Sequence, residues 1–175
     1  GLNVKVRGLT GLPCWVAFSL MAFTAVTHAH NGERKIDLAG NLNATKTNLN
    51  TPNHAISIHA LEQQLELHRL QVNNPWDKKT AWYQGVWLES LVDMFAKPNT
   101  TQVTLTAIDD YQVTINKAQW QKFRILVVTQ ENDQYLSVAN KGPLRIVFPE
   151  YATGNKDYEL NLHLWAWMIN RIEFN

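Results

Sequence analysis

Three strand-like segments joined by short polar turns constrain the fold of this chain most. Residues Gln102–Ile108 and Tyr111–Ile115 alternate apolar and polar side chains, and Ile125–Thr129 is a continuous apolar run. The pair Asp109-Asp110 between the first two is a turn signal, and so short a turn joins antiparallel strands. A parallel doubly wound sheet would need a helix between successive strands, and that alternation is missing. The pattern therefore predicts a mixed α/β (α+β) fold with antiparallel or mixed strands.

Helical periodicity appears in two places before these strands. Apolar residues recur at helical spacing within Ala55–Leu70, which predicts a helix that starts near Ser57. The segment Trp87–Phe95 is amphipathic and stops before Pro98, which predicts a second helix with Trp87 at its start. Between the two helices, Gln71–Gln84 has no clear period, and we interpret it as irregular.

The remaining segments complete one domain. Arg34–Leu38 is strand-like, and the Asn- and Thr-rich run NLNATKTNLNTPN after it predicts a long loop. Turns are expected at Asn132-Asp133 and at Lys141-Gly142-Pro143, the second leading into a strand over Leu144–Phe148. With 175 residues, 45% of them hydrophobic, and no internal repeat, the chain suits a single compact domain over residues 30–175.

Residues 1–29 have the pattern of a signal peptide. Lys5 and Arg7 precede an uncharged apolar run, Leu12–Val26, and Ala29 offers a small residue for cleavage. A run of about 15 residues is short for a membrane span of roughly 20, although an uncleaved anchor is the alternative. We therefore expect export to the periplasm. Cleavage would also remove Cys14, the only cysteine, and leave a mature domain without a thiol.

Charge and motif patterns exclude several functions. The formal net charge is +1 and no block of Lys or Arg stands out, so no nucleic-acid partner is expected. His54, His59 and His68 do not converge with acids or cysteine into a metal-ligating pattern, and we interpret them as surface or capping residues. There is no Gly-x-Ser-x-Gly elbow and no glycine-rich phosphate loop. No catalytic residue is predicted.

Four short motifs occur in an order that is similar to a known family. They are Tyr83-Gln84-Gly85-Val86, Ala107-Ile108-Asp109-Asp110-Tyr111, Gly142-Pro143-Leu144-Arg145 and the segment of Trp165 with Ile169 and Ile172. Together they resemble the molybdopterin-binding domain of the sulfite oxidase-like oxidoreductases, over roughly residues 36–174. The resemblance implies the compact mixed α/β fold of that catalytic domain.

The departures from the family pattern change the function that the resemblance implies. Enzymes of this family place a cysteine sulfur on molybdenum, and the corresponding region, roughly His68–Tyr83, holds none. Since the site would lack its soft thiolate, molybdenum is not expected. Small, exported, cysteine-less members of this fold resemble pterin-binding proteins that hold a free, reduced pterin in the periplasm. The family implies that they act as ligand sensors without catalysis, through the periplasmic domain of a membrane-bound enzyme of cyclic di-GMP turnover, and contact the membrane only through that partner.

Aromatic residues are the first candidates for holding a flat pterin. Trp76, after Pro75, is the first choice for a stacking platform; the alternative is a tryptophan that plugs the edge of the core. Trp82 and Tyr83 are the next candidates, Tyr83 because it matches the family's aromatic residue before Gly85. Stacking of flat heteroaromatic rings on such side chains contributes on the order of 1–3 kcal/mol.

Polar candidates complete the predicted site. Asp109 or Asp110 would accept from the amino group of a pterin, although both are also ordinary turn residues. Tyr111 matches a family position and would line the wall, or would instead be a cross-strand aromatic residue. Arg145 would donate to a pterin oxygen or support one of the two acids. Trp120, Trp165 and Trp167 lie in periodic segments, and we expect at least two of them to be packing residues.

Three functions remain open from the sequence. The first is the periplasmic pterin-binding sensor just described. The second is a molybdopterin-dependent oxidoreductase that holds its cofactor through contacts other than cysteine. The third is a structural partner domain whose cavity no longer binds a ligand. The identity of the small molecule bound separates the three.

Overall fold

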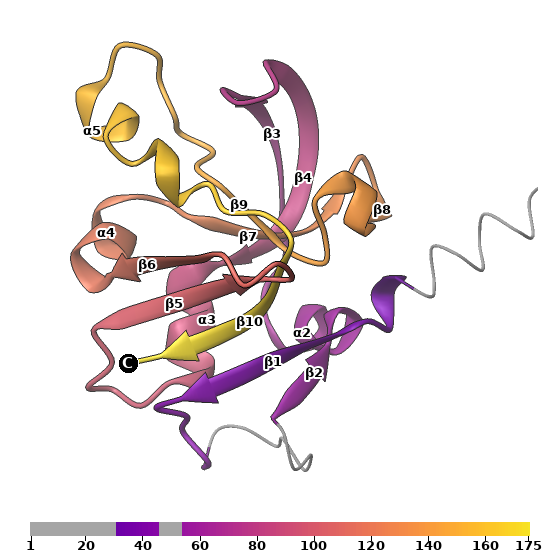
Figure 1. The fold of residues 1–175 in the computed structure, drawn as a ribbon, viewed down its shortest axis with the longest axis vertical. Helices are drawn as coiled ribbons and strands as arrows, with labels where there is room; N and C mark the ends of the chain where they lie inside the picture. Colours follow the sequence, from indigo (N-terminus) through magenta and orange to yellow (C-terminus); the bar gives the residue numbers. More distant parts are fainter. Residues whose placement is uncertain (1–30, 46–53) are drawn as a thin grey trace, which may run out of the picture.

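Two β-sheets build the domain (Figure 1). The computed structural model describes residues 31–45 and 54–175, so the predicted signal peptide and most of the Asn- and Thr-rich run lie outside the described residues. The first sheet has the order β2-β1-β10-β5-β6, and only its β1–β10 pair is parallel. Its strands are β1 (Lys35–Gly40), β2 (Ala55–Ser57), β5 (Gln102–Ala107), β6 (Gln112–Asn116) and β10 (Ile169–Phe174).

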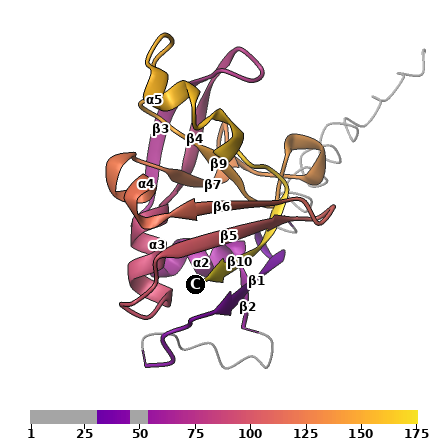
Figure 2. The same ribbon diagram turned by 60° about the vertical axis from the view of Figure 1, so that its left-hand side comes forward.

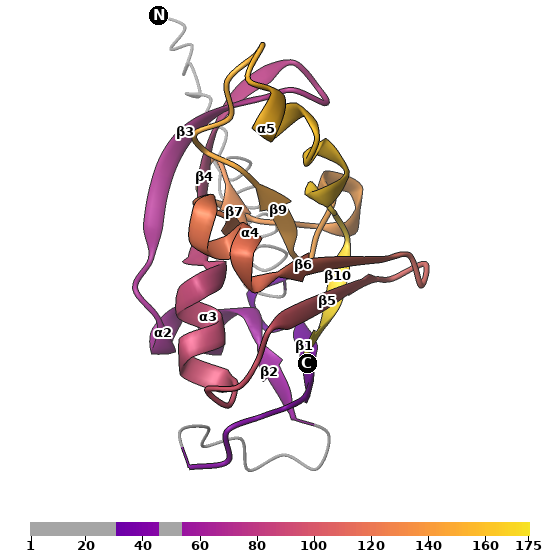
Figure 3. The same ribbon diagram turned by 90° about the vertical axis from the view of Figure 1, so that its left-hand side faces the viewer.

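The second sheet is antiparallel in every pair and has the order β3-β4-β7-β8, with β9 also paired to β7. Its strands are β3 (His68–Asn74), β4 (Lys79–Trp87), β7 (Leu126–Glu131), β8 (Gln134–Tyr135) and β9 (Arg145–Val147). The hairpin of β3 and β4 rises along one side of the molecule, and its tip lies at the same end as α5 (Figure 3).

Short helices cover the sheets and connect them. They are α2 (Ile58–Gln64), α3 (Leu88–Phe95), α4 (Lys117–Lys122), α5 (Lys156–Glu159) and the 3-10 turns η1 (Val138–Asn140) and η2 (Leu162–Leu164). The amphipathic α3 buries Leu88, Leu91 and Phe95 in the shared core, where apolar burial contributes roughly 25 cal/mol per Å². In the part of the chain that the structure describes, no helix has both the length and the hydropathy of a membrane span.

The prediction of a mixed α+β single domain is confirmed, and so are most of its elements. The strands β5, β6 and β7 and the helix α3 fall where the sequence pattern predicts them, with Trp87 as the N-cap of α3. The turns at Asp109-Asp110 and Asn132-Asp133 are present, with positive φ at Asp110 and at both residues of the second turn.

Two local predictions are wrong. The first helix starts after Ser57, whose hydroxyl accepts from the amide of Ala60 at 3.0 Å, but it ends at Gln64 rather than near residue 70. Residues 71–84 are not irregular, because β3 and β4 pair in register from His68↔Gly85 to Asn74↔Lys79. The cause is cross-strand pairing, which keeps Val72 and Tyr83 inside the domain and leaves Gln71, Asn73 and Trp82 exposed.

Candidate functional site

A cavity of about 340 Å³ lies where three segments meet. One is the turn between β3 and β4, another is the turn between β5 and β6, which projects from the body of the domain (Figure 2), and the third is the stretch from η2 to β10. The residues that line it are Trp76, Ala107, Asp109, Tyr111, Leu162, His163, Trp165, Ala166, Trp167 and Met168. Its volume falls in the range of small-molecule sites, roughly 300–1,000 Å³.

Backbone hydrogen bonds fix the position of the third segment. Ala166 O accepts from the amide of Ile146 at 2.8 Å, which ties the segment to β9. The amide of Met168 donates to Lys141 O at 2.8 Å, and Met168 O accepts from the amide of Ile108 at 2.9 Å. One stretch of chain therefore joins the Gly-Pro turn to the β5–β6 turn, and its side chains form one wall of the cavity.

Two tryptophans meet at the cavity from opposite sides. The ring centroids of Trp76 and Trp167 are 6.3 Å apart and the rings are inclined at 80°, an edge-to-face contact. The amide of Trp76 donates to Asn74 Oδ1 at 2.9 Å, which fixes the turn that carries it, and half of the Trp76 side chain remains exposed. The Lys141 ammonium lies 4.7 Å from the centre of the Trp167 ring. The cavity thus has an accessible aromatic platform.

The β5–β6 turn supplies the acidic side of the cavity. Asp109 Oδ1 accepts from the amide of Tyr111 at 3.2 Å, so the predicted turn chemistry is present. Asp109 and Tyr111 both line the cavity, and Tyr111 is more than half exposed. Asp110 has a φ of 68°, is exposed, and is not among the lining residues. Of the two candidate acids, Asp109 is the one that a ligand in this cavity would meet.

Trp165 forms a buried part of the wall. Its ring stacks on Phe148 with centroids 5.8 Å apart and an interplanar angle of 14°, and it meets Tyr151 edge-on at 6.0 Å. Only 3% of the residue is exposed. Its indole Nε1 is buried and has no hydrogen-bond partner among the described residues. A buried donor without an acceptor is uncommon and costs roughly 1–3 kcal/mol.

Arg145 and Tyr83 lie inside the domain rather than on the cavity lining. The guanidinium carbon is 5.4 Å from the centre of the Tyr83 ring, and Nη1 is 4.0 Å from a carboxylate oxygen of Glu131. Arg145 Nε is buried with no hydrogen-bond partner in the described residues. Asn74 Nδ2 donates to the Tyr83 hydroxyl at 3.3 Å. Burial raises the pKa of Tyr83, and the bond from Asn74 and the Arg145 charge offset part of that rise.

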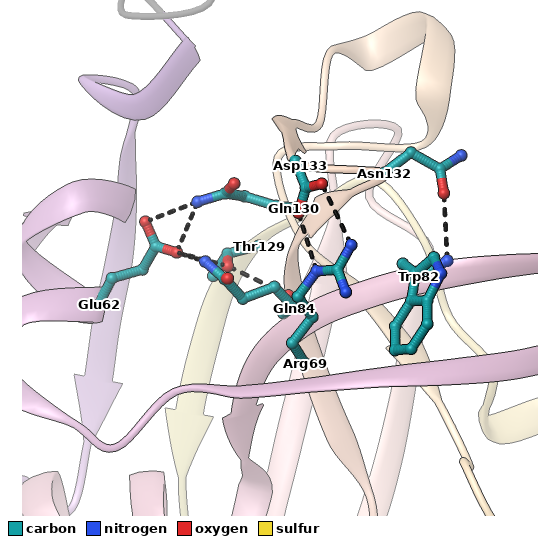
Figure 4. Close-up of polar contacts among 8 residues, drawn as sticks. All are labelled: Glu62, Arg69, Trp82, Gln84, Thr129, Gln130, Asn132 and Asp133. Atoms are coloured by element: carbon teal, nitrogen blue, oxygen red, sulfur yellow. Dashed lines mark hydrogen bonds and ion pairs between the residues drawn. The ribbon is translucent and has the colours of Figure 1, made fainter.

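Trp82 points away from Tyr83, as neighbours on a strand do. Its ring packs under the guanidinium of Arg69 at 4.2 Å, and its amide donates to Asn132 Oδ1 at 3.1 Å (Figure 4). Arg69 forms two hydrogen bonds to Asp133, at 2.9 and 3.1 Å, and hydrogen bonding to Arg69 lowers the pKa of Asp133. Trp82 therefore belongs to an exposed surface that does not line the cavity.

A polar cluster around Glu62, drawn in Figure 4, satisfies its carboxylate with hydrogen bonds from the fold itself, without a ligand. The buried carboxylate oxygen Glu62 Oε2 accepts from Thr129 Oγ1 at 2.9 Å, Gln130 Nε2 at 3.0 Å and Gln84 Nε2 at 3.1 Å. Burial, and then the bond to Glu62, raise the pKa of Tyr135. Since its donors are neutral side chains of the fold itself, this cluster joins α2 to the second sheet and is not a candidate ligand site.

The structure divides the seven predicted ligand contacts into three groups. The cavity brings together Trp76, Asp109 and Tyr111, with Asp110 beside them in the turn. Tyr83 and Arg145 are buried, and Trp82 lies elsewhere. Contact with a ligand stays a prediction for all of them.

Sequence reasoning assigned no binding role to His163, Trp165, Trp167 and Met168, which also line the cavity. Trp165 and Trp120 are buried, which confirms that at least two of the three tryptophans in periodic segments pack in the core.

The side chains present fit a pterin and supply no protein thiolate from the described residues. Cys14, the only cysteine of the chain, lies outside residues 31–45 and 54–175. Within those ranges no three or more His, Cys, Asp or Glu residues gather as metal ligands. The cavity offers aromatic faces and a carboxylate, which suit a flat heterocycle with donor groups at its edge.

The fold is that of a sheet-rich α+β domain, and its cavity has the volume of a small-molecule site and a largely aromatic lining. The family model described as the oxidoreductase molybdopterin-binding domain matches residues 35–157, and the chain belongs to this family. The resemblance seen in the sequence motifs is thereby confirmed. Membership suggests a pterin-type ligand.

A solved structure shows the same fold. The sulfane dehydrogenase SoxCD from Paracoccus pantotrophus is similar with a TM-score of 0.55 and 12% sequence identity, over 82% of this chain and 38% of that chain. This chain thus spans well under half of the length of that protein, and at this identity the likeness concerns the fold alone. None of the curated proteins matches the chain.

Proposed function

We propose that this protein is a periplasmic binding protein for a free, reduced pterin, and that it acts as a ligand sensor without catalysis of its own. The observation that carries the proposal is the lining of the cavity. Its charged or titratable side chains are Asp109, His163 and Tyr111, and three tryptophans supply most of its aromatic surface.

The chemistry of the lining suits a pterin ring. A pterin is a flat bicycle with a 2-amino-4-oxo edge, and the half-exposed Trp76 offers a face on which it can stack. The Asp109 carboxylate would accept from the amino group and the adjacent ring N–H, which are charge-assisted hydrogen bonds. Family membership supports the same class of ligand.

The lining also favours a pterin without a phosphate. Among its residues there is no Lys or Arg to neutralise a phosphate, and the one residue that is anionic at neutral pH is Asp109. A phosphate placed beside Asp109 would meet a like charge, with no Lys or Arg on the lining to offset it, which is unfavourable in a partly enclosed site. A free pterin with a hydroxylated side chain avoids this cost.

The sensor role and the location rest on the sequence. Residues 1–29 have the pattern of an export signal, and the small cysteine-less members of the fold resemble sensors for a membrane-bound enzyme of cyclic di-GMP turnover. Exposed aromatic side chains at Trp76 and Trp82 suit contact with that enzyme's periplasmic domain.

A pull-down with this protein as the bait tests the sensor role: more of the enzyme's purified periplasmic domain should be captured when the pterin is added. Equal capture with and without the pterin would count against the sensor role.

The experiment that tests ligand identity is a release assay. The full chain is expressed in its native compartment, purified and denatured, and the released small molecules are identified by fluorescence and mass spectrometry, with metal analysis of the same sample. We expect one free pterin per chain without molybdenum. An empty protein that also fails to bind added tetrahydropterin would refute the proposal.

A second candidate function has one observation in its favour. Arg145 is a buried cation whose ion pair is long and whose Nε lacks a partner in the described residues, as expected if an anionic group completes the site. A molybdopterin held through contacts other than cysteine would supply such a group, and with its metal it would supply redox chemistry. Molybdenum and molybdopterin in the release assay would support this alternative.

A further inference from the structure

The outer edge of β3 is an open strand edge. β3 stands at the end of the second sheet and pairs with β4 over seven residues without a register shift. Apart from that pairing, no backbone hydrogen bond within the described residues reaches residues 68–73. Figure 3 shows β3 at the margin of the molecule, with no other described element along its outer side. Alternate N–H and C=O groups of β3 therefore point outward, where a further strand can pair with them.

The side chains of β3 also show that this edge is open. Leu70 shares the inward face with Tyr83, its cross-strand partner, yet Leu70 is only half-buried while Tyr83 is fully buried. Long edge strands are usually protected by a bulge, a proline or an unpaired charge. β3 contains no proline and no bulge, and the charge of Arg69 is already paired with Asp133. The strand thus lacks the features that prevent pairing with a second strand.

Other strands at sheet edges are shorter. β6 has five residues, β2 and β9 have three each, and β8 has two. The hydrogen bonds available to a docking strand increase with the length of the edge, so β3 offers the most extensive pairing surface of the described sheets.

We propose that β3 pairs with β3 of a second copy of this chain, antiparallel about a two-fold axis at Gln71, so that two sheets join into one. Directly opposite residues of an antiparallel pair share a face of the sheet, so the axis must pass through a residue. Gln71 is the position that pairs all seven residues of the strand. The opposed residues would be His68 with Asn74, Arg69 with Asn73, Leu70 with Val72, and Gln71 with itself. This inference does not depend on the ligand.

The strand is complementary to itself in this register. On the inward face, Leu70 would meet Val72 of the other copy, which buries the apolar surface that Leu70 leaves exposed. On the outward face, Arg69 would lie opposite the neutral Asn73 and not opposite a second arginine. Like charges directly opposite each other are destabilising, and this register has none.

Charges beyond the two ends of β3 favour a second copy as the occupant. The tip of the hairpin carries the exposed Lys78 and Lys79 against one acid, Asp77, and the exposed Glu66 precedes the start of the strand. An antiparallel pair places the tip of one copy beside the start of β3 in the other, so the two lysines lie near a carboxylate. An extended segment of another protein could add to the open edge, but the match at both ends is specific to a second copy.

The test is the oligomeric state of the chain purified from its native compartment. Sedimentation equilibrium is measured over about a hundredfold range of protein concentration. A single strand pair is a small interface, so we expect a reversible equilibrium of monomer and dimer instead of a permanent dimer. A chain that stays monomeric over the whole range would overturn the proposal.

Substitutions at Gln71 locate the interface. Gln71→Lys and Gln71→Glu each place like charges opposite each other across the axis, so each variant alone should dimerise roughly 3- to 10-fold more weakly. An equimolar mixture places opposite charges across the axis and should recover at least the association of the wild type. Gln102→Lys makes the same substitution at an exposed position of β5, in the other sheet, and should dimerise as the wild type does.

The other outcomes separate this pairing from a different interface. If both Gln71 variants dimerise as strongly as the wild type, the interface lies elsewhere and the proposal is refuted. A mixture that associates no better than either variant alone refutes it as well, and so does an equal loss in Gln102→Lys, which would show an effect of net charge. Because Gln71 is exposed, the variants should keep the circular dichroism spectrum and the urea midpoint of the wild type.

Tetrahydropterin binding is measured on the same samples. We expect the dimer with and without the pterin. A protein that dimerises but binds no pterin would contradict the proposed function and leave the pairing of β3 intact, so the two failures are distinguishable.

Discussion

Replacing Arg145 by methionine tests whether the fold or a ligand accounts for this buried cation. Arg145 is 3% exposed, so desolvation of its guanidinium costs several kcal/mol, and the unpartnered Nε adds about 1–3 kcal/mol. Against this, the pair with Glu131 at 4.0 Å contributes roughly 4 kcal/mol at an effective dielectric constant of 20. The contact with Tyr83 contributes about 0.5–2 kcal/mol. The opposing contributions nearly cancel before any packing gain.

We therefore expect Arg145→Met to leave the free energy of unfolding unchanged or to raise it by up to about 2 kcal/mol, because methionine fills the site without a charge. That gain would raise Tm by roughly 3–5 °C per kcal/mol in a domain of this size. Glu131 is left without its partner, but a quarter of its side chain reaches water.

Urea denaturation at neutral pH measures the change, with Arg69→Met as the control. Arg69 is exposed and holds Asp133 at the surface, so its loss should cost less than about 1 kcal/mol. If Arg145→Met lowers the free energy of unfolding by more than about 1.5 kcal/mol and leaves ligand affinity intact, Arg145 is a structural pin and our reasoning is refuted.

Three further predictions concern the cavity, the buried carboxylate and the surface ion pair. Trp76→Ala should weaken tetrahydropterin binding on the order of 5- to 150-fold through lost stacking, measured by calorimetry; unchanged affinity would remove Trp76 from the site. Thr129→Val keeps the shape of a fully buried side chain but removes the donor at 2.9 Å from Glu62, so it should cost about 1.5–3 kcal/mol in urea denaturation. The lowered pKa of Asp133 means that its bond to Arg69 stabilises the fold above the usual carboxyl range and is lost on acidification. The stability difference between wild type and Asp133→Asn should therefore be present at pH 7, begin to fall near the usual carboxyl pKa of about 4, and disappear as the pH falls through the lowered pKa of Asp133.

Local patterns determined what could be predicted of the fold. Alternation and turn residues are properties of neighbours in sequence, so β5, β6 and the turn at Asp109 could be identified directly. The β3–β4 hairpin was missed because its signal is cross-strand: Tyr83 pairs with Leu70 and Trp82 with Gln71, and neither pairing is visible in one segment alone. The aromatic cluster around Pro75 obscured a strand pair whose buried positions do alternate.

The candidate site was predictable only where it lies on turns. Trp76, Asp109 and Tyr111 could be selected because exposed turn residues are typical of binding sites. Trp165 and Trp167 join them only through the hydrogen bond from the Met168 amide to Lys141 O and similar long-range contacts. Which of several tryptophans faces a cavity depends on such tertiary pairing, and no periodicity in the sequence encodes it.

The distribution of unfavourable features in the described residues supports a binding role for this end of the domain. The Glu62 cluster shows that the fold can satisfy a buried charge with several donors. Yet Arg145 Nε and Trp165 Nε1 are left unpartnered, and both belong to segments joined by the bond between Ile146 N and Ala166 O. Met168, on the cavity wall, has a φ of 54°, which costs a bulky side chain backbone energy. Selection for stability alone would remove such features, because single substitutions relieve each of them. Trp165 and Met168 lie on the cavity lining and Arg145 lies inside the domain, joined to the lining through the bond between Ile146 N and Ala166 O, and unfavourable features of this kind are typical of functional sites.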